Sequence, residues 1–255
     1  TARAPAEDAV AVVAPHAGWY FSGDLAALAI HALGACDTVI VCGGHLRAGD
    51  PLCIAREDAF DCVVRIADND TVLLQAFLRT LQEMGIEEIE EDIYPDNSVE
   101  VLLPLAALRF PDARMLCMRM PPDYKAREAG LALAAAALET GRKVGFIAST
   151  DLTHYGPNYH YMSRGVGPQA EAWVREKNDR ALIDAALAMD TELVLKQGRE
   201  EQAACSAGAV VAAITFAQER GAVRGILMRH KLSSEVMHDL SFVGYAAIAF
   251  TGGDR

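Results

Sequence analysis

Two histidines that each follow a short apolar run are the first residues able to do chemistry. His16 comes just after residues 10–14, and His45 comes just after residues 38–42. Such runs indicate buried strands, and an imidazole exposed at a strand end can bind a transition metal. Each histidine taken alone is also compatible with a hydrogen-bonded structural role, and only the two together indicate a metal site.

Gly43 and Gly44 stand directly before His45. Two glycines let the backbone turn sharply and let a bound group approach closely. A phosphate-binding loop is an alternative, but the segment has neither a GxGxxG nor a Walker pattern. Metal binding by the two histidines is therefore the favoured interpretation.

Asp151 and His154 form a second group, in the segment STDLTHYG at residues 149–156. They lie three residues apart where a predicted strand ends, and a carboxylate there can fix the tautomer of an imidazole and raise its basicity. We expect an acid/base pair. The alternative is that Asp151 only caps the following turn.

Cys205 precedes a predicted helix, where the positive end of the helix dipole favours the thiolate form that binds metals or attacks carbon. A buried, inert thiol is equally compatible with this position. The six cysteines include no CxxC pair, which argues against a zinc ribbon or a thioredoxin-type site. Scattered cysteines in a chain of this length predict a reduced, cytoplasmic protein.

The elements that must position these residues alternate between strand and helix. Apolar runs predict strands at residues 10–14, 38–42, 114–119, 144–149, 223–228 and 242–250, with a hairpin formed by residues 52–55 and 60–66. Helical patterns cover residues 23–33, 69–84, 98–110, 123–141, 169–189 and 209–220. Asp68 or Asn69 is expected to cap the second helix, Gly85 to end it, and Pro104 to bend or break the third.

This alternation predicts one α/β domain over residues 1–255, with a mixed or parallel central sheet and helices on both faces. Ligands of such sheets bind beyond the carboxyl ends of the strands. His16, His45, Asp151 and His154 all fall at that edge.

Composition excludes several classes of function. The net charge is −12 and no basic cluster opposes it, so nucleic acid is not expected as a partner. The acidic run at residues 87–92 is interpreted as a solvated surface. No apolar run reaches the roughly 18 uncharged residues of a membrane span, and the first residues lack the apolar centre of an export signal.

The motifs PHAGWYFSG, GGH, PDNSVEVLLPL and STDLTHYG, followed by a late cysteine before an apolar helix, occur in that order. Over nearly its whole length the sequence resembles the Memo family, whose bacterial and archaeal members are often called AmmeMemoRadiSam system protein B. The resemblance implies a LigB-like fold, that of the class III extradiol dioxygenases. Those enzymes bind non-haem Fe(II) through two histidines and a carboxylate.

In Memo-like proteins the corresponding ligands are two histidines and a cysteine, which fall here on His16, His45 and Cys205. Asp151 and His154 match further pocket residues of the family. Members commonly read HS(I/V)E where this chain has NSVE at residues 97–100, so this chain lacks that imidazole and any proton transfer that it performs in relatives. Gly43-Gly44 also differs from the small-residue pair of many relatives, which we expect to alter only the shape of the pocket.

The resemblance and the residues together predict a metal-dependent oxidoreductase with dioxygenase-like chemistry on a small, aromatic molecule. His154 would take a proton from a substrate hydroxyl, and Asp151 would orient it. Fe(II) is the expected metal, although a thiolate ligand suits copper or zinc as well. Whether the protein is an enzyme, and whether it forms a homo-oligomer, the sequence leaves open.

Two alternatives differ in class. The protein could be a non-catalytic member that binds a metal or a peptide. It could instead be a cysteine hydrolase that uses Cys205, His154 and Asp151 without a metal, but no nucleophile-elbow motif supports this.

Overall fold

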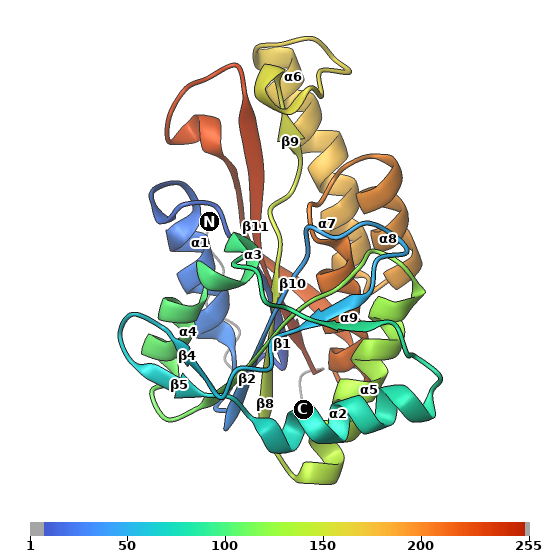
Figure 1. Cartoon of the computed structure of the whole chain (residues 1–255). Helices are drawn as coiled ribbons and strands as arrows, with labels where there is room; N and C mark the ends of the chain where they lie inside the picture. The colour runs from blue at the N-terminus through green and yellow to red at the C-terminus, as the bar shows by residue number, and fades with distance from the viewer. Residues whose placement is uncertain (1–7, 253–255) are drawn as a thin grey trace.

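The computed structural model describes residues 8–252, and these form a central sheet covered by helices (Figure 1). From one edge to the other the strands are β10 (Arg224–Leu232), β11 (Phe242–Thr251), β1 (Ala11–Ala14), β8 (Val144–Ser149), β2 (Thr38–Gly43), β7 (Arg114–Arg119), β3 (Leu52–Ile54) and β6 (Ile89–Glu91). A short strand, β9 (His154–Tyr155), pairs with β11 off this path.

Strands β1, β8, β2 and β7 are parallel, whereas β11 on β1 and β3 on β7 are antiparallel. Every residue of β1, β2 and β11 is buried. Strands covered on both faces need apolar residues at consecutive positions, which is why the runs AVVA and TVIVC mark them. The predicted mixed α/β sheet is confirmed.

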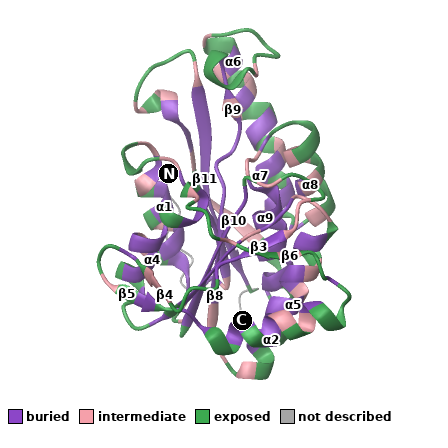
Figure 2. Ribbon diagram, in the orientation of Figure 1, coloured by how far each residue is buried: buried purple, intermediate pink, exposed green. Residues whose placement is uncertain are grey.

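Two hydrophobic cores lie on opposite faces of this sheet, and Figure 2 shows the buried sheet between them. The first face carries α1 (Trp19–Ala32), α3 (Asn97–Glu100) and α4 (Leu103–Arg109). The second carries α2 (Thr71–Glu83), α5 (Tyr124–Thr140), α7 (Asp179–Leu187), α8 (Thr191–Glu200) and α9 (Ala207–Glu219). On this second face α5 and α9 pack closely, and Gly130 makes this possible. A Cβ at its position would lie only 2.6 Å from the carbonyl oxygen of Ala212.

Helix ends follow the sequence signals closely. The side chain of Asp70 caps α2 by accepting from the N–H of Leu73, so the cap lies one or two residues later than predicted. Gly85 follows that helix with φ +76°, as its predicted role as the stop requires. Pro104 stands in the first turn of α4 and separates it from α3, which confirms the predicted break.

The predicted hairpin between residues 52–55 and 60–66 is wrong. β3 pairs with β6 and β7, while β4 (Ala59–Asp61) pairs with β5 (Ile66–Asp68). The turn that joins β4 and β5 is closed by Cys62, whose N–H donates to the carbonyl of Arg65, and by Val63 at φ +66°. A β-branched residue at positive φ gives no turn signal in a sequence.

The helix predicted over residues 169–189 is divided. It consists of α6 (Pro168–Trp173), a π-helical turn (Val174–Asn178) and α7. Helix α8 has no counterpart in the sequence prediction, because most of its residues are polar and Val194 alone of them is buried, so no apolar run marks it.

No helix within residues 8–252 combines the length and the apolar character needed to cross a bilayer. The N-terminal residues on which the export-signal prediction rests lie mostly outside this range.

Candidate metal centre

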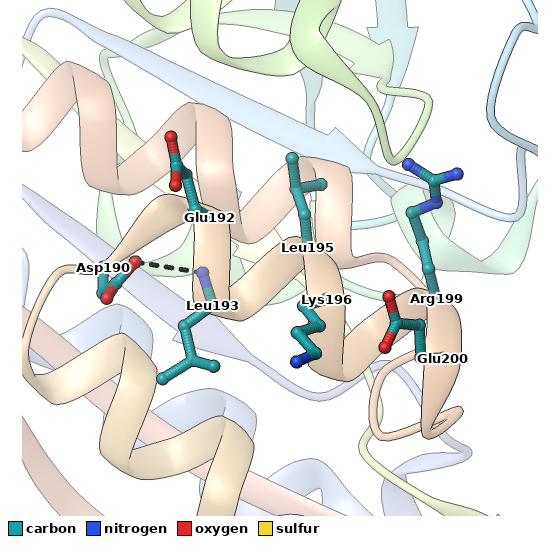
Figure 3. Close-up of a pocket in the computed structure, with 7 residues that line it drawn as sticks. All are labelled: Asp190, Glu192, Leu193, Leu195, Lys196, Arg199 and Glu200. Atoms are coloured by element: carbon teal, nitrogen blue, oxygen red, sulfur yellow. Dashed lines mark hydrogen bonds between the residues drawn. The ribbon is translucent and has the colours of Figure 1, made fainter.

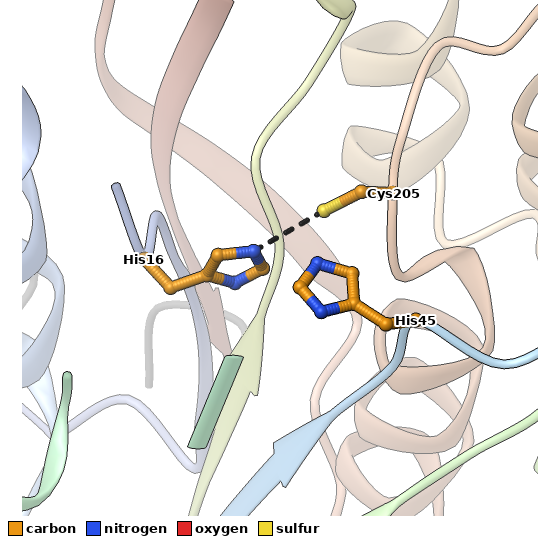
Figure 4. A group of neighbouring side chains, drawn as sticks. All are labelled: His16, His45 and Cys205. Carbon is orange, nitrogen blue, oxygen red and sulfur yellow. Dashed lines mark hydrogen bonds between the residues drawn. The ribbon is translucent and has the colours of Figure 1, made fainter. Parts of the chain in front are cut away.

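The carboxyl ends of β1, β2 and β8 meet at one edge of the sheet, and the loop before α9 passes over them. His16 follows β1, His45 follows β2, and Cys205 precedes the N-cap residue of α9. One ligand atom from each lies within 4.8 Å of the others. Figure 4 shows the two imidazoles and the sulfur pointing toward one another.

The His16 ring is buried and held from two sides. Its Nδ1 lies 2.9 Å from the Ser149 hydroxyl, and its Nε2 lies 3.4 Å from the Cys205 sulfur. The backbone N–H of His16 donates to Asp151 Oδ1 over 2.8 Å, which fixes the main chain as well. The contact at Nδ1 therefore leaves Nε2 as the atom presented to the centre.

His45 is oriented by a carboxylate. Its Nδ1 lies 3.1 Å from Asp96 Oδ1, and the other carboxylate oxygen of Asp96 is 3.2 Å from Arg119 Nη1. Arg119 in turn forms a two-pronged ion pair with Asp92. A carboxylate at Nδ1 fixes the tautomer of an imidazole, so Nε2 of His45 is also the nitrogen that faces the centre.

His45 and Asp96 each stabilise the charged form of the other. The pKa of His45 is raised because its ring faces the Cys205 sulfur, and nearby Asp96 adds to this against the opposing effect of burial. Burial alone would raise the pKa of Asp96, but hydrogen bonds from Ser98 and the positive charges of His45 and Arg119 lower it overall. Asp96 is therefore a carboxylate at neutral pH.

The glycine pair before His45 serves close packing rather than a sharp turn. A Cβ on Gly43 would lie 2.1 Å from the Ser98 hydroxyl, and one on Gly44 would lie 2.5 Å from the Ser206 side chain. The positive φ in this loop, +58°, belongs to His45 itself. The two glycines thus let the start of α3 and the start of α9 approach the end of β2.

Polar groups surround the Cys205 sulfur. The backbone N–H of Asp151 donates to it over 3.3 Å, and the Ser206 hydroxyl lies 3.5 Å away. The Thr150 hydroxyl lies 3.6 Å away, but it donates its proton to the carbonyl of Asp151. The N–H of Cys205 donates to the carbonyl of Asp151. Donors directed at sulfur stabilise negative charge there, which suits a thiolate ligand.

Asp151 and His154 lie beside the centre but do not form the predicted hydrogen-bonded pair. Nδ1 of His154 lies 3.2 Å from the carbonyl of Leu152, whereas Asp151 Oδ1 accepts from the N–H groups of His16 and Ala17. The orienting group of His154 is therefore a backbone carbonyl. Nor does Asp151 cap its own turn, because its side chain accepts from N–H groups of the loop after β1.

His154 has the properties of a base. Burial lowers the pKa of its imidazole, and the negative charge of Asp151 opposes this only in part. The ring stacks edge-on against Tyr159, with 4.9 Å between ring centroids. At neutral pH the ring is uncharged, and with Nδ1 directed at Leu152 its Nε2 is free to accept a proton.

Two cavities meet at His154 and Tyr159. One, of about 280 Å³, reaches Cys205, and the other, of about 330 Å³, extends past Asp151. A more open hollow of about 670 Å³ (Figure 3) is lined by α8 and its capping residue alone, mostly with charged side chains. None of its lining residues belongs to the candidate site, whereas the first two cavities are lined by Cys205 or Asp151.

Sequence reasoning missed Ser149 and Asp96, although both stand in the motifs STDLTHYG and PDNSVEVLLPL. The family motif marks position 97, but Asn97 is exposed at the start of α3. Asp96, the residue before it, contacts His45. The position of Ser149, a polar residue at the end of β8, was the sequence feature that could have identified it as the partner of His16.

Comparisons with known proteins point to one family. The model of a family described as Memo-like protein matches residues 2–249. A MEMO1 family protein of Methanococcoides burtonii is 35% identical over 247 residues, covering 95% of this chain and 86% of the relative. The MEMO1 family protein MTH_45 of Methanothermobacter thermautotrophicus is 33% identical, covering 93% and 83%.

The crystal structure of the uncharacterized protein JW3007 from Escherichia coli K12 superposes with a TM-score of 0.61, covering 95% of this chain and 99% of that one. Its sequence identity is 11%, so this likeness concerns the fold alone.

Proposed function

The chain belongs to the family of Memo-like proteins, and on that basis we propose that it binds one divalent metal through Nε2 of His16, Nε2 of His45 and the sulfur of Cys205. The convergence of these three atoms within 4.8 Å is the observation that carries the proposal. Each imidazole has a partner at Nδ1, which is the arrangement that prepares Nε2 for a metal.

The donor set fits a first-row transition metal. Two neutral imidazoles and a thiolate are ligands of intermediate to soft character, suited to Fe(II), copper or zinc and poorly suited to Mg²⁺ or Ca²⁺. Three protein ligands leave coordination positions for a small molecule. We assign Fe(II) as the working metal, with copper and zinc as the competitors to be tested.

We further propose that the site is an oxidoreductase centre of the dioxygenase type, acting on a hydroxylated aromatic molecule. Bound Fe(II) would supply Lewis acidity and redox chemistry. His154 is the general base that takes the hydroxyl proton at Nε2, since burial keeps the ring neutral and Leu152 fixes its tautomer. Asp151 fixes the backbone of His16 and lends negative charge to the cavity beside the ring.

A non-catalytic metal-binding protein is the second candidate, favoured by the exposed Asn97 where family members commonly have a histidine. Turnover separates the two candidates. The protein is purified without oxygen, its metal content is measured, and each of Fe(II), Cu and Zn is restored to the stripped protein before oxygen and a catechol are added.

We expect about one metal ion per chain and ring cleavage with Fe(II) alone. Full metal content without turnover of any hydroxylated ring would favour the binding protein. Absence of metal binding at micromolar concentrations would overturn both candidates.

A further inference from the structure

The cavity that extends past Asp151 has aromatic walls and acidic side chains. Phe21, Tyr159 and Tyr245 supply the aromatic faces, while Asp151 and Asp239 supply two carboxylates. In the part of the chain that the structure describes, none of its lining residues is lysine or arginine. Its volume of about 330 Å³ falls in the range of small-molecule sites.

The rim of this cavity is a built structure. The N–H of Asn158 donates to the Ser241 hydroxyl over 3.1 Å, which ties the turn after β9 to the loop before β11. Gly156 lies at φ +111°, and a Cβ there would fall 2.5 Å from the carbonyl oxygen of Leu240. These contacts set Tyr159 and Asp239, one on each segment, at the mouth of the same cavity.

Asp151 is buried, with 4% of the residue exposed, and only one of its carboxylate oxygens accepts hydrogen bonds from residues 8–252. Oδ1 accepts from the N–H groups of His16 and Ala17, at 2.8 and 3.2 Å. Oδ2 accepts no hydrogen bond from any of residues 8–252, although Asp151 lines the cavity. Oδ2 is not among the fully buried polar atoms of the described residues, so it is accessible from the cavity, where the donor of a ligand can take the place of water.

The electrostatic environment agrees. The pKa of the Tyr159 hydroxyl is raised by burial and then by the negative charges of Asp151 and Asp239. His154, the remaining basic group of the lining, is neutral for the reason given above. The cavity therefore has a negative potential, and His154 does not cancel it.

We propose that this cavity binds the ammonium group of an aromatic amine, so that the substrate of the neighbouring centre is a hydroxylated ring with a cationic tail. The ammonium donates to Asp151 Oδ2 and to Asp239, and the faces of Tyr159 and Phe21 attract it further. A ring with a carboxylate tail is disfavoured by the same charges. The assignment rests on the function proposed above, because His154 and Tyr159 also wall the cavity that reaches Cys205.

The test uses binding alone, so that it does not depend on the metal or on turnover. Three phenols that do not chelate metals differ only in the charge of the tail: tyramine is a cation, 4-ethylphenol is neutral and 4-hydroxyphenylacetate is an anion. Their dissociation constants for the metal-free protein are measured by calorimetry or by chemical-shift titration at pH 7 and low salt.

We expect tyramine to bind about tenfold more tightly than 4-hydroxyphenylacetate, since each exposed ion pair or cation–π contact contributes a factor of about two to five. Asp239→Asn should reduce tyramine affinity about two- to fivefold, because Asp239 is exposed at the rim. Asp112→Asn is the matched control, since Asp112 is also exposed but lies in the turn before β7. High salt should diminish the preference.

Equal affinities for the cation and the anion would overturn the proposal, as would a tyramine preference that Asp239→Asn and Asp112→Asn reduce equally. If the charge preference is found but no metal binds to His16, His45 and Cys205, the cavity assignment stands and the metal function fails. If metal binds but the cation and the anion bind equally well, the metal site stands and the cavity assignment fails.

Discussion

The carboxylate of Asp96 should govern metal affinity without touching the metal. Replacing Asp96 by Asn keeps the shape of the side chain but removes the charge from the contact with Nδ1 of His45, at 3.1 Å. A hydrogen bond to a charged group contributes about 1.5–3 kcal/mol. The His45 side chain is 32% exposed and that of Asp96 14%, so the lower half of that range applies.

About 1.5–2 kcal/mol corresponds to a 10- to 30-fold loss of affinity, which agrees with the 10- to 100-fold usual for partners of ligating histidines. The assay is a competition for Zn²⁺ against a fluorescent chelator at pH 7. Asp92→Asn is the control, because Asp92 pairs with the same Arg119 but does not contact His45. We expect a change of less than about threefold in that variant.

The reasoning is refuted if Asp96→Asn binds zinc as tightly as the unmodified protein, or if Asp92→Asn weakens binding equally. The second result would mean that the ion-pair network as a whole, and not the carboxylate behind His45, determines affinity. Thermal unfolding of both variants, followed by circular dichroism, detects any general loss of structure.

Further predictions concern the ligands and the base. His16→Ala, His45→Ala and Cys205→Ser should each remove most of the metal, measured by elemental analysis, while circular dichroism shows a folded protein; full metal content in all three would show that the ligand set is wrong. His154→Ala should retain the metal but lower turnover by about 10²–10⁴-fold, and an unchanged rate would limit His154 to packing. Because burial lowers the pKa of His154 below 6.5, activity should persist at pH 6.5 and fall only at lower pH. The folding stability that this neutral imidazole contributes is fully present above pH 6.5 and should also decline as the pH falls. A rate that has already fallen by half at pH 6.5 would contradict this prediction. Iodoacetamide should label Cys205 in the metal-free protein and much less in the loaded one, and equal labelling would remove the sulfur from the ligand set. Gly44→Ala should destabilise the fold by about 1–3 kcal/mol in denaturant titrations, because its Cβ would overlap Ser206, and an unchanged midpoint would refute this close packing.

The strands that carry the site could be predicted because burial imposes a simple pattern on them. The parallel strands β2, β7 and β8 lie within one residue of the apolar runs at residues 38–42, 114–119 and 144–149. Once the strands are placed, the rule that ligands bind at their carboxyl ends brings His16 and His45 to one edge. Cys205 came from the family resemblance, since a cysteine before a helix has an inert interpretation of equal weight.

The partners of the candidate ligands could not be predicted in the same way. Ser149 is 133 residues from His16, and Asp96 is 51 residues from His45, so no local spacing records either contact. The expected link between Asp151 and His154 failed for the opposite reason. Three residues of separation suggested a contact, but the backbone turns so that Leu152 is nearer to the ring nitrogen.

Asp151 has a different role from the one that its spacing suggests, and this decides how the site should be tested. Its Oδ1 fixes the loop of His16, its N–H donates to the Cys205 sulfur, and its carbonyl accepts from the Cys205 N–H. One residue thus joins two of the three candidate ligands, while Oδ2 accepts from no donor within residues 8–252. Removing the Asp151 carboxylate would disturb metal affinity and cavity charge together. The charge of the cavity has to be tested at Asp239, which lines it and is not bonded to any of the three ligands.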